Sequence, residues 1–338
     1  MRNPDSRRAA IVGLSGPALT VGEADLLRLH PPAGVILFAR NVEDRAQLGA
    51  LTAALRQILP PDSVLMVDQE GGRVARLRPP HWRAHPPAAA LGRLFDAEPA
   101  RGKRAAFLTG ALIGAECVAS GLDVVAAPVL DRGLPGAHDV IGDRAFGADP
   151  RAIAEMGRAV ADGLLAAGAQ PVIKHAPGHG RARADSHHAL PVVEGSPAEA
   201  EADILPFALN ADLPWAMTAH ILYPAWDAAH PATLSRAVVK DVIRDRIGFG
   251  GVLVSDDLAM GALTGAPVDR ALAALEAGCD LALYCAGDIA ATATLLAACP
   301  EISPAGLERL ASARASAARA YRPLDPAALA AERDALLG

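Results

Sequence analysis

The sequence predicts an α/β fold in which eight parallel strands alternate with helices and close into a barrel, with further closing helices at the C-terminal end. Three observations carry this prediction. Short apolar runs recur along the chain, amphipathic stretches separate most of them, and polar residues follow directly after the runs. Continuous apolar strands that alternate with helices indicate a parallel sheet whose outer face is covered.

Eight apolar runs, spread along the chain, define the candidate strands. They are residues 9–14, 34–38, 63–67, 122–129, 170–174, 214–219, 251–255 and 280–285. Between them, apolar residues recur three and four positions apart, as in residues 42–59, 100–120 and 149–168, which predicts amphipathic helices. Eight such units are enough for a (β/α)8, TIM-like barrel, and an open doubly wound sheet is the alternative.

The polar residues that follow the strands favour the barrel. A barrel gathers the carboxyl ends of its strands at one mouth, where the active sites of barrel enzymes lie, whereas an open sheet spreads them along a line. The Ala-rich segment from Pro304 onward predicts closing helices, and no glycine or serine linker divides residues 1–338, which we expect to form one catalytic domain. The strand-end polar residues are Arg40, Asn41, Asp68 to Arg73, Asp131, Arg132, His175, His220, Asp256 and Asp257.

The composition of the chain indicates which kinds of partner and which cell compartment to expect. A net charge of -6 and a pI near 5.9 provide no basic surface for nucleic acid or anionic lipid, which favours a small-molecule partner. No apolar stretch is long enough for a secretory signal or a membrane span, so we expect a cytoplasmic protein. The four cysteines lack metal-ligand spacing and lie among apolar residues, which predicts reduced, buried thiols.

Residues 174–190, KHAPGHGRARADSHHAL, are unusually rich in groups that can carry chemistry, and three hypotheses compete. Lys174, one of only three lysines, ends an apolar strand and could form an imine or donate hydrogen bonds to a polyhydroxylated substrate. A metal site is the second hypothesis, although Pro177 and Gly178 preclude a regular helix on which two histidines four positions apart would share one face. Its candidate ligands are His175, His179, Asp185, His187 and His188.

The third hypothesis pairs Asp185 with His187 for proton transfer. In an extended segment, side chains two residues apart lie on the same side, so the carboxylate can hydrogen-bond one imidazole nitrogen. The other nitrogen is then available to move a proton. Glycine and alanine between Gly178 and His187 predict a pliable loop that could carry this pair over a pocket.

Two further motifs lie at predicted strand ends. The segment 251–260, GVLVSDDLAM, ends in Asp256 and Asp257, and alternation along a strand would point one carboxylate into the barrel mouth and the other away. An N-cap is the structural alternative for either residue. The segment 68–77, DQEGGRVARL, reads as a tight turn with charged neighbours and does not match the dinucleotide fingerprint. A carboxylate that faces a His-Asp pair is the arrangement that two-step displacement at a sugar requires.

Several motifs in order resemble one enzyme family. KHAPGHG followed by DSH, together with VDQEGGRV, VIGDRAFGADP, MTAHI and GVLVSDDLAM, resembles the NagZ-type β-N-acetylhexosaminidases of glycoside hydrolase family 3. The resemblance runs from about Gly34 to about Cys285, and it is weaker before Gly34. Members of the family often carry an aromatic residue where this chain has Ala176, which raises the question of pocket packing.

The resemblance implies a retaining exo-glycosidase that removes terminal β-linked N-acetylglucosamine. The implied substrate is the N-acetylglucosaminyl-1,6-anhydro-N-acetylmuramic acid muropeptide of peptidoglycan recycling, with no metal or organic cofactor, and we expect a monomer. Two other hypotheses stay open: a metal-dependent barrel hydrolase and a non-catalytic sugar-binding barrel. The resemblance implies Asp256 as nucleophile, His187 as general acid/base assisted by Asp185, and Asp68, Arg144, Lys174 and His175 as sugar-binding residues, and it leaves His179 and His188 without a role beyond loop structure.

Overall fold

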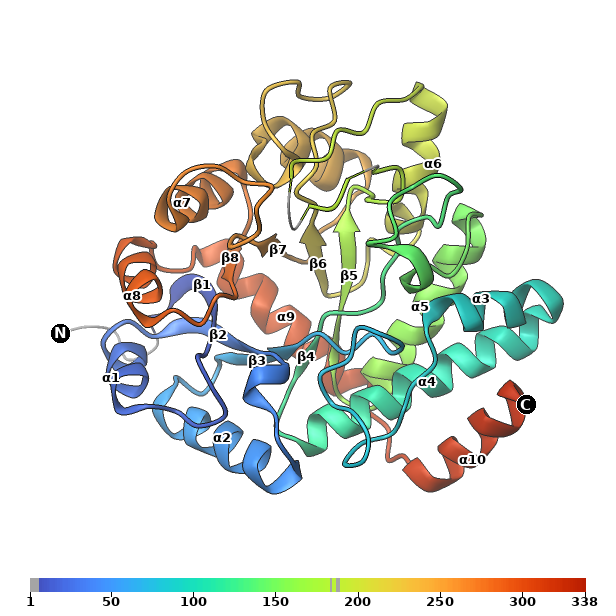
Figure 1. The fold of residues 1–338 in the computed structure, drawn as a ribbon, viewed down its shortest axis with the longest axis horizontal. Coiled ribbons are helices and arrows are strands. Elements are labelled where there is room, and N and C mark those ends of the chain that lie inside the picture. Colours follow the sequence, from blue (N-terminus) through green and yellow to red (C-terminus); the bar gives the residue numbers. More distant parts are fainter. Residues whose placement is uncertain (1–5, 183, 187–188) are drawn as a thin grey trace.

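The computed structural model describes residues 6–182, 184–186 and 189–338, and in them eight parallel strands form a closed barrel in sequence order (Figure 1). β1 pairs with both β2 and β8, which closes the ring. This confirms the predicted α/β barrel and excludes the open sheet. The strands are β1 (Arg8–Gly13), β2 (Pro32–Leu37), β3 (Val64–Val67), β4 (Val124–Val125), β5 (Gln170–Ala176), β6 (Trp215–Thr218), β7 (Val252–Asp257) and β8 (Leu281–Tyr284).

Helices surround the barrel and begin with the expected signals (Figure 1). Thr20 and Ser196 form capping boxes, and proline occupies the first turn of several helices, where its missing N–H costs nothing. The helices are α1 (Val21–Leu29), α2 (Arg45–Ile58), α3 (Ala88–Ala97), α4 (Pro99–Ala119), α5 (Pro150–Ala166), α6 (Pro197–Ala208), α7 (Pro267–Ala277), α8 (Ile289–Ala298), α9 (Pro304–Ala320) and α10 (Pro326–Leu337), with a π-helix at Val238–Arg246 and 3-10 turns at Ala39–Asn41, η2 (Gly142–Arg144) and Ala232–Leu234.

The core has two layers, and this explains why the strands are apolar at almost every position. Side chains such as Ile11, Met66 and Val254 fill the barrel interior, while Val12 and Val67 point outward into the layer beneath the helices. Both faces of each strand are therefore buried, as is usual for parallel sheets. A strand with two buried faces cannot show the alternation of a half-exposed one.

Small residues set the helix packing, which accounts for the Ala-rich and Gly-rich composition. A Cβ on Gly110 of α4 would lie 2.1 Å from the carbonyl oxygen of Val160 in α5. The two helix backbones can approach closely only because this side chain is absent. Close helix contacts of this kind leave little room for aromatic residues, which make up only 4% of the chain.

The predicted closing helices are α9 and α10, and α10 lies along α4 (Figure 1). The buried side chain of Arg333 in α10 donates a hydrogen bond to His85 Nδ1 at 2.9 Å. The four cysteines are buried, free thiols, as predicted. No helix in the described part of the chain is both long and apolar enough to cross a bilayer.

Candidate active site

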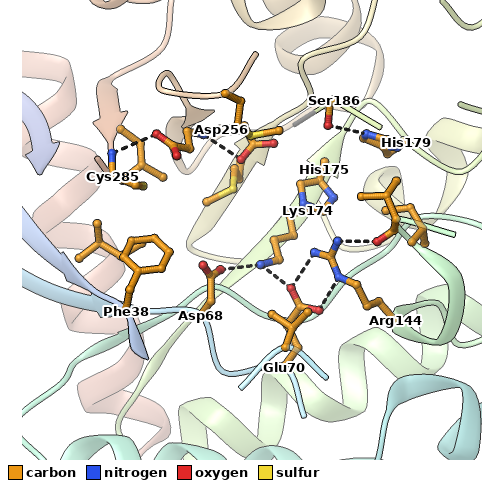
Figure 2. A pocket seen from close by; sticks show the side chains of 18 of the residues that line it. Phe38, Asp68, Glu70, Arg144, Lys174, His175, His179, Ser186, Asp256 and Cys285 are labelled. Atoms are coloured by element: carbon orange, nitrogen blue, oxygen red, sulfur yellow. Dashed lines mark hydrogen bonds and ion pairs between the residues drawn. The ribbon is translucent and has the colours of Figure 1, made fainter. Parts of the chain in front are cut away.

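A cavity of about 160 Å³ lies at the carboxyl end of the strands, and charged side chains from four segments converge on it (Figure 2). Asp68 and Glu70 follow β3, η2 supplies Arg144, Lys174 and His175 lie near the end of β5, and Asp256 lies near the end of β7. The strand-end residues therefore meet at one mouth, as the barrel prediction required. Of the residues that the sequence predicted for the site, the cavity is bordered by Asp68, Arg144, Lys174, His175 and Asp256.

Lys174 is buried and lies between two carboxylates. Its Nζ is 2.9 Å from Asp68 Oδ1 and 2.7 Å from Glu70 Oε1, and only 2% of the side chain is exposed (Figure 2). Burial alone would lower the pKa of this ammonium group, but Asp68 and Glu70 outweigh burial and raise it. A charged ammonium group is not a nucleophile, so this geometry argues against the imine hypothesis. It suits a fixed hydrogen-bond donor.

Glu70 links Lys174 to Arg144, and it was named from the sequence only within the strand-end run from Asp68 to Arg73, without a site role. Arg144 donates two hydrogen bonds to the Glu70 carboxylate, both at 2.8 Å, in the bidentate geometry of strong ion pairs. Burial would raise the pKa of Glu70, but Lys174 and Arg144 hold it below its ordinary value. Glu70 stands two positions after Asp68, and this same-side spacing in the DQEGG turn was the available signal.

The turn after Glu70 requires glycine. Gly71 and Gly72 have φ values of 98° and 54°, a region that other residues rarely adopt. A Cβ on Gly71 would also lie 2.5 Å from the carbonyl oxygen of Pro86. The tight turn predicted from the sequence is therefore present, and it holds Asp68 and Glu70 beside Lys174.

Asp131 orients His175 and was named as a strand-end residue without a site role. Its Oδ2 lies 2.6 Å from His175 Nδ1, and its Oδ1 accepts a 2.6 Å hydrogen bond from the backbone N–H of His179. Burial would raise the pKa of Asp131, but His175 lowers it overall. A carboxylate at Nδ1 fixes the orientation of the imidazole, so Nε2 of His175 is the ring nitrogen available to a ligand.

The two aspartates at the end of β7 have different surroundings, although both border the cavity. Among the described residues, Asp256 Oδ1 accepts one hydrogen bond, from the backbone N–H of Asp257 at 2.8 Å. Asp257 Oδ1 accepts two, from the backbone N–H groups of Ala259 at 2.9 Å and Cys285 at 3.0 Å. Asp257 thus joins β7 to the end of β8 and to the following turn, which is a structural role.

Their pKa values are shifted in opposite directions. Burial would raise the pKa of Asp256, but His220 and His175 outweigh it and lower the value, which favours the ionised carboxylate. Burial raises the pKa of Asp257. The alternation expected along this strand is interrupted, because the pairing of β7 with β8 shifts register between Val254 and Asp257.

Comparison with known proteins identifies the family. Residues 18–318 match the model of the glycosyl hydrolase family 3 N terminal domain. The chain belongs to glycosyl hydrolase family 3. Within the family it is a glycoside hydrolase of the NagZ-type β-hexosaminidase group, as its motifs predicted.

The similarity to its relatives extends over most of the length of both proteins. A β-hexosaminidase of Nitrosospira multiformis is 42% identical over 309 residues, which cover 90% of this chain and 88% of that protein. One from Bordetella pertussis is 43% identical over 285 residues, 83% of this chain and 80% of that protein. The crystal structure of NagZ from Neisseria gonorrhoeae in complex with N-trifluoroacetyl-D-glucosamine superposes with a TM-score of 0.87 at 32% identity, covering 98% of this chain and 99% of that one.

The loop of this β-hexosaminidase from Gly178 to His187 is described in part. Gly178 accepts a hydrogen bond from the Tyr223 hydroxyl group at 2.7 Å, and the carbonyl of Ala182 accepts one from His138 at 2.9 Å. Ser186 borders the cavity, whereas Asp185, beside it in the chain, does not. The loop's pliability stays a prediction. His187 and His188 lie outside the described residues, and with them the predicted Asp185–His187 pair.

Two other expectations concern the surroundings of the site. Ala176 is buried in the core beneath the helices and does not border the cavity, so a small residue there does not open the pocket directly. Across residues 6–182, 184–186 and 189–338, no three His, Cys, Asp or Glu side chains are grouped to hold a metal ion. Two of the hypothetical metal ligands, His187 and His188, are not among those residues.

Proposed function

We propose that this β-hexosaminidase is a retaining exo-β-N-acetylglucosaminidase that works through a covalent glycosyl-enzyme. The observation that carries the proposal is Asp256, whose lowered pKa keeps a carboxylate ionised inside a cavity bordered by hydrogen-bond donors. An ionised carboxylate within such a pocket can attack an anomeric carbon. The complex of the related gonococcal NagZ with N-trifluoroacetyl-D-glucosamine supports a glucosamine derivative as the sugar.

The proposed reaction has two steps. Asp256 attacks the anomeric carbon while His187, assisted by Asp185, protonates the departing oxygen. Water activated by the same histidine then releases the sugar. A histidine with a pKa near its reference value of about 6.5 can donate and accept a proton at neutral pH, and a neighbouring carboxylate stabilises its charged form.

Sugar recognition is proposed for the ionic network of Asp68, Glu70, Lys174 and Arg144, all of which border the cavity. Lys174 and Arg144 are held by Asp68 and Glu70, so their remaining donor capacity is fixed in direction before a substrate arrives. Groups fixed in this way lose little entropy on binding. Asp68, Arg144, Lys174 and His175 would bind the hydroxyl and acetamido groups of the terminal sugar.

The natural substrate is proposed from the family resemblance. We infer a muropeptide, N-acetylglucosaminyl-1,6-anhydro-N-acetylmuramic acid, and thus a role in peptidoglycan recycling, with residues 1–338 acting as one catalytic domain, as a monomer in the cytoplasm. A higher kcat/KM for this disaccharide than for N,N′-diacetylchitobiose would support the assignment. Equal or lower values would contradict it.

A chromogenic N-acetylglucosaminide assay, with and without a chelator, tests the proposed activity against its alternatives. We expect hydrolysis that EDTA does not reduce, because the proposed groups are carboxylates, an imidazole and cationic side chains. A metal-dependent hydrolase would lose activity with the chelator. A non-catalytic sugar-binding barrel would show none in either condition, and that result would refute the proposal.

The stereochemistry of release tests the covalent intermediate. Two displacements at the anomeric carbon retain its configuration, so proton NMR should show the β anomer of N-acetylglucosamine first, with the α anomer growing later by mutarotation. Initial release of the α anomer would indicate a single displacement by water. In that case Asp256 would act as a base rather than as the nucleophile.

A further inference from the structure

His179 is a buried histidine at the edge of the cavity to which the proposed function gives no task. It follows β5 in the HAPGH turn, it is 3% exposed, and it borders the cavity. Its backbone N–H donates to Asp131 Oδ1 at 2.6 Å. Its ring packs edge to face against His175, with centroids 5.8 Å apart. The same carboxylate therefore fixes both His175 and the start of the following loop.

The side chain of His179 contacts that loop at its far end. His179 Nε2 lies 3.1 Å from Ser186 Oγ, and Ser186 is 2% exposed (Figure 2). The carbonyl of Ser186 accepts a 3.1 Å hydrogen bond from the N–H of Ala262, in the segment after β7. Ser186 thus joins the turn that bears His179 to the segment that follows β7. In the sequence it stands directly between Asp185 and His187.

The ring of His179 is neutral, and among the described residues its side chain forms one hydrogen bond, with Ser186. Burial lowers its pKa to about 4, although Asp131 opposes the shift. Its Nδ1 is buried and has no hydrogen-bond partner among the described residues. A buried, unsatisfied polar atom destabilises a fold, and a buried leucine or phenylalanine would avoid that cost. The bond from Nε2 to Ser186 is what the imidazole provides and an apolar side chain does not.

We propose that His179 is a positioning residue, which holds the segment carrying Asp185 beside the cavity through the hydrogen bond between its Nε2 and Ser186 Oγ. This inference rests on the proposed function, in which Asp185 and His187 move the proton. Asp68, Lys174 and Arg144 are held by ion pairs among themselves and with Glu70, and Asp131 holds His175, so these groups have partners other than Ser186. Loss of the hydrogen bond between His179 and Ser186 should therefore impair proton transfer and leave sugar binding nearly unchanged.

The test compares two substrates that differ in their need for protonation. His179→Phe and Ser186→Ala each remove the bond while keeping a similar volume. For an alkyl β-N-acetylglucosaminide we expect kcat/KM to fall roughly 10- to 100-fold, the usual cost of misplacing a catalytic group. For the 2,4-dinitrophenyl glycoside, whose leaving group needs no proton, we expect a loss of less than about 3-fold, because kcat/KM reports the first chemical step. Wild-type enzyme and His187→Ala are the references.

A matched pair of amide variants separates positioning from packing. The amide nitrogen of Gln can occupy the place of the histidine Nε2, and that of Asn can occupy the place of Nδ1. His179→Gln should therefore recover activity on the alkyl glycoside, and His179→Asn should not. The double variant His179→Phe/Ser186→Ala should be no worse than either single variant, because both remove one shared interaction.

Several outcomes would overturn the inference. They are equal losses on both glycosides, additive losses in the double variant, or His179→Gln no better than His179→Asn in samples with wild-type melting temperatures. If His179→Phe fails to fold, Ser186→Ala carries the same comparison. Wild-type protein that hydrolyses neither glycoside would refute the proposed function itself. A leaving-group effect in His187→Ala without one in the His179 and Ser186 variants would refute only the positioning role.

Discussion

Replacing Asp256 by Asn is expected to reduce turnover of 4-nitrophenyl β-N-acetylglucosaminide on the order of 10⁵-fold, the scale at which loss of a nucleophile acts. The substitution preserves size and can still accept the hydrogen bond from the N–H of Asp257. It removes only the charge that His220 and His175 favour at this position. Steady-state kinetics measure the loss. Wild-type enzyme can also be denatured during turnover of a slow substrate, so that the covalent intermediate is trapped. Mass spectrometry should then find the sugar on the peptide that contains Asp256.

Asp257→Asn is the matched control for that variant. Asp257 Oδ1 accepts hydrogen bonds from the N–H groups of Ala259 and Cys285, and the amide oxygen of Asn can accept both. We therefore expect a loss of less than about 10-fold, with the fold intact. If Asp257→Asn is the inactive variant and Asp256→Asn retains activity, the nucleophile assignment is wrong.

Much of the fold was predictable because it depends on pattern alone. All eight apolar runs became barrel strands, since a parallel strand buried on both faces needs a continuous apolar sequence. Strand ends were less predictable. The run at residues 122–129 contains only the short strand β4, and the chain passes through Pro128, which has no N–H to donate to a neighbouring strand. The length of an apolar run therefore does not predict where hydrogen bonding between neighbouring strands ends.

The candidate site was predictable where motifs place a polar residue at a strand end, and this applies to Asp68, Lys174, His175 and Asp256. Asp131 and Glu70 were named at strand ends but were given no site role, because each binds side chains that are distant in the sequence. The partners of Asp131 lie 44 and 48 positions away, and those of Glu70 lie on β5 and η2. Only the closed barrel brings these residues together. The register shift at the end of β7 is likewise a property of strand pairing.

Replacing Glu70 by Gln is expected to have the largest effect on stability. Glu70 accepts hydrogen bonds from Arg144 and lies 2.7 Å from Lys174 Nζ, and its side chain is 7% exposed. Lys174 keeps Asp68 as a partner, but Arg144 loses its bidentate carboxylate, and removing one partner of a buried ion pair typically costs about 3 to 5 kcal/mol. Urea unfolding at pH 7 measures the difference. Glu155→Gln is the control, since its pair with Lys103 is half exposed and should contribute less than about 1 kcal/mol.

The pH dependence of this stability difference tests its electrostatic origin. Burial would raise the pKa of Glu70, but Lys174 and Arg144 lower it below the ordinary value of 4.5. A carboxylate with a lowered pKa contributes stability that is fully present above its unfolded value and is lost as the pH falls through its folded value. The gap between wild-type protein and Glu70→Gln should therefore be constant above about pH 5 and narrow below pH 4.5. A gap that stays constant down to pH 3 would mean that the glutamate acts through packing, and the ionic account of the Asp68–Lys174–Glu70–Arg144 network would fail.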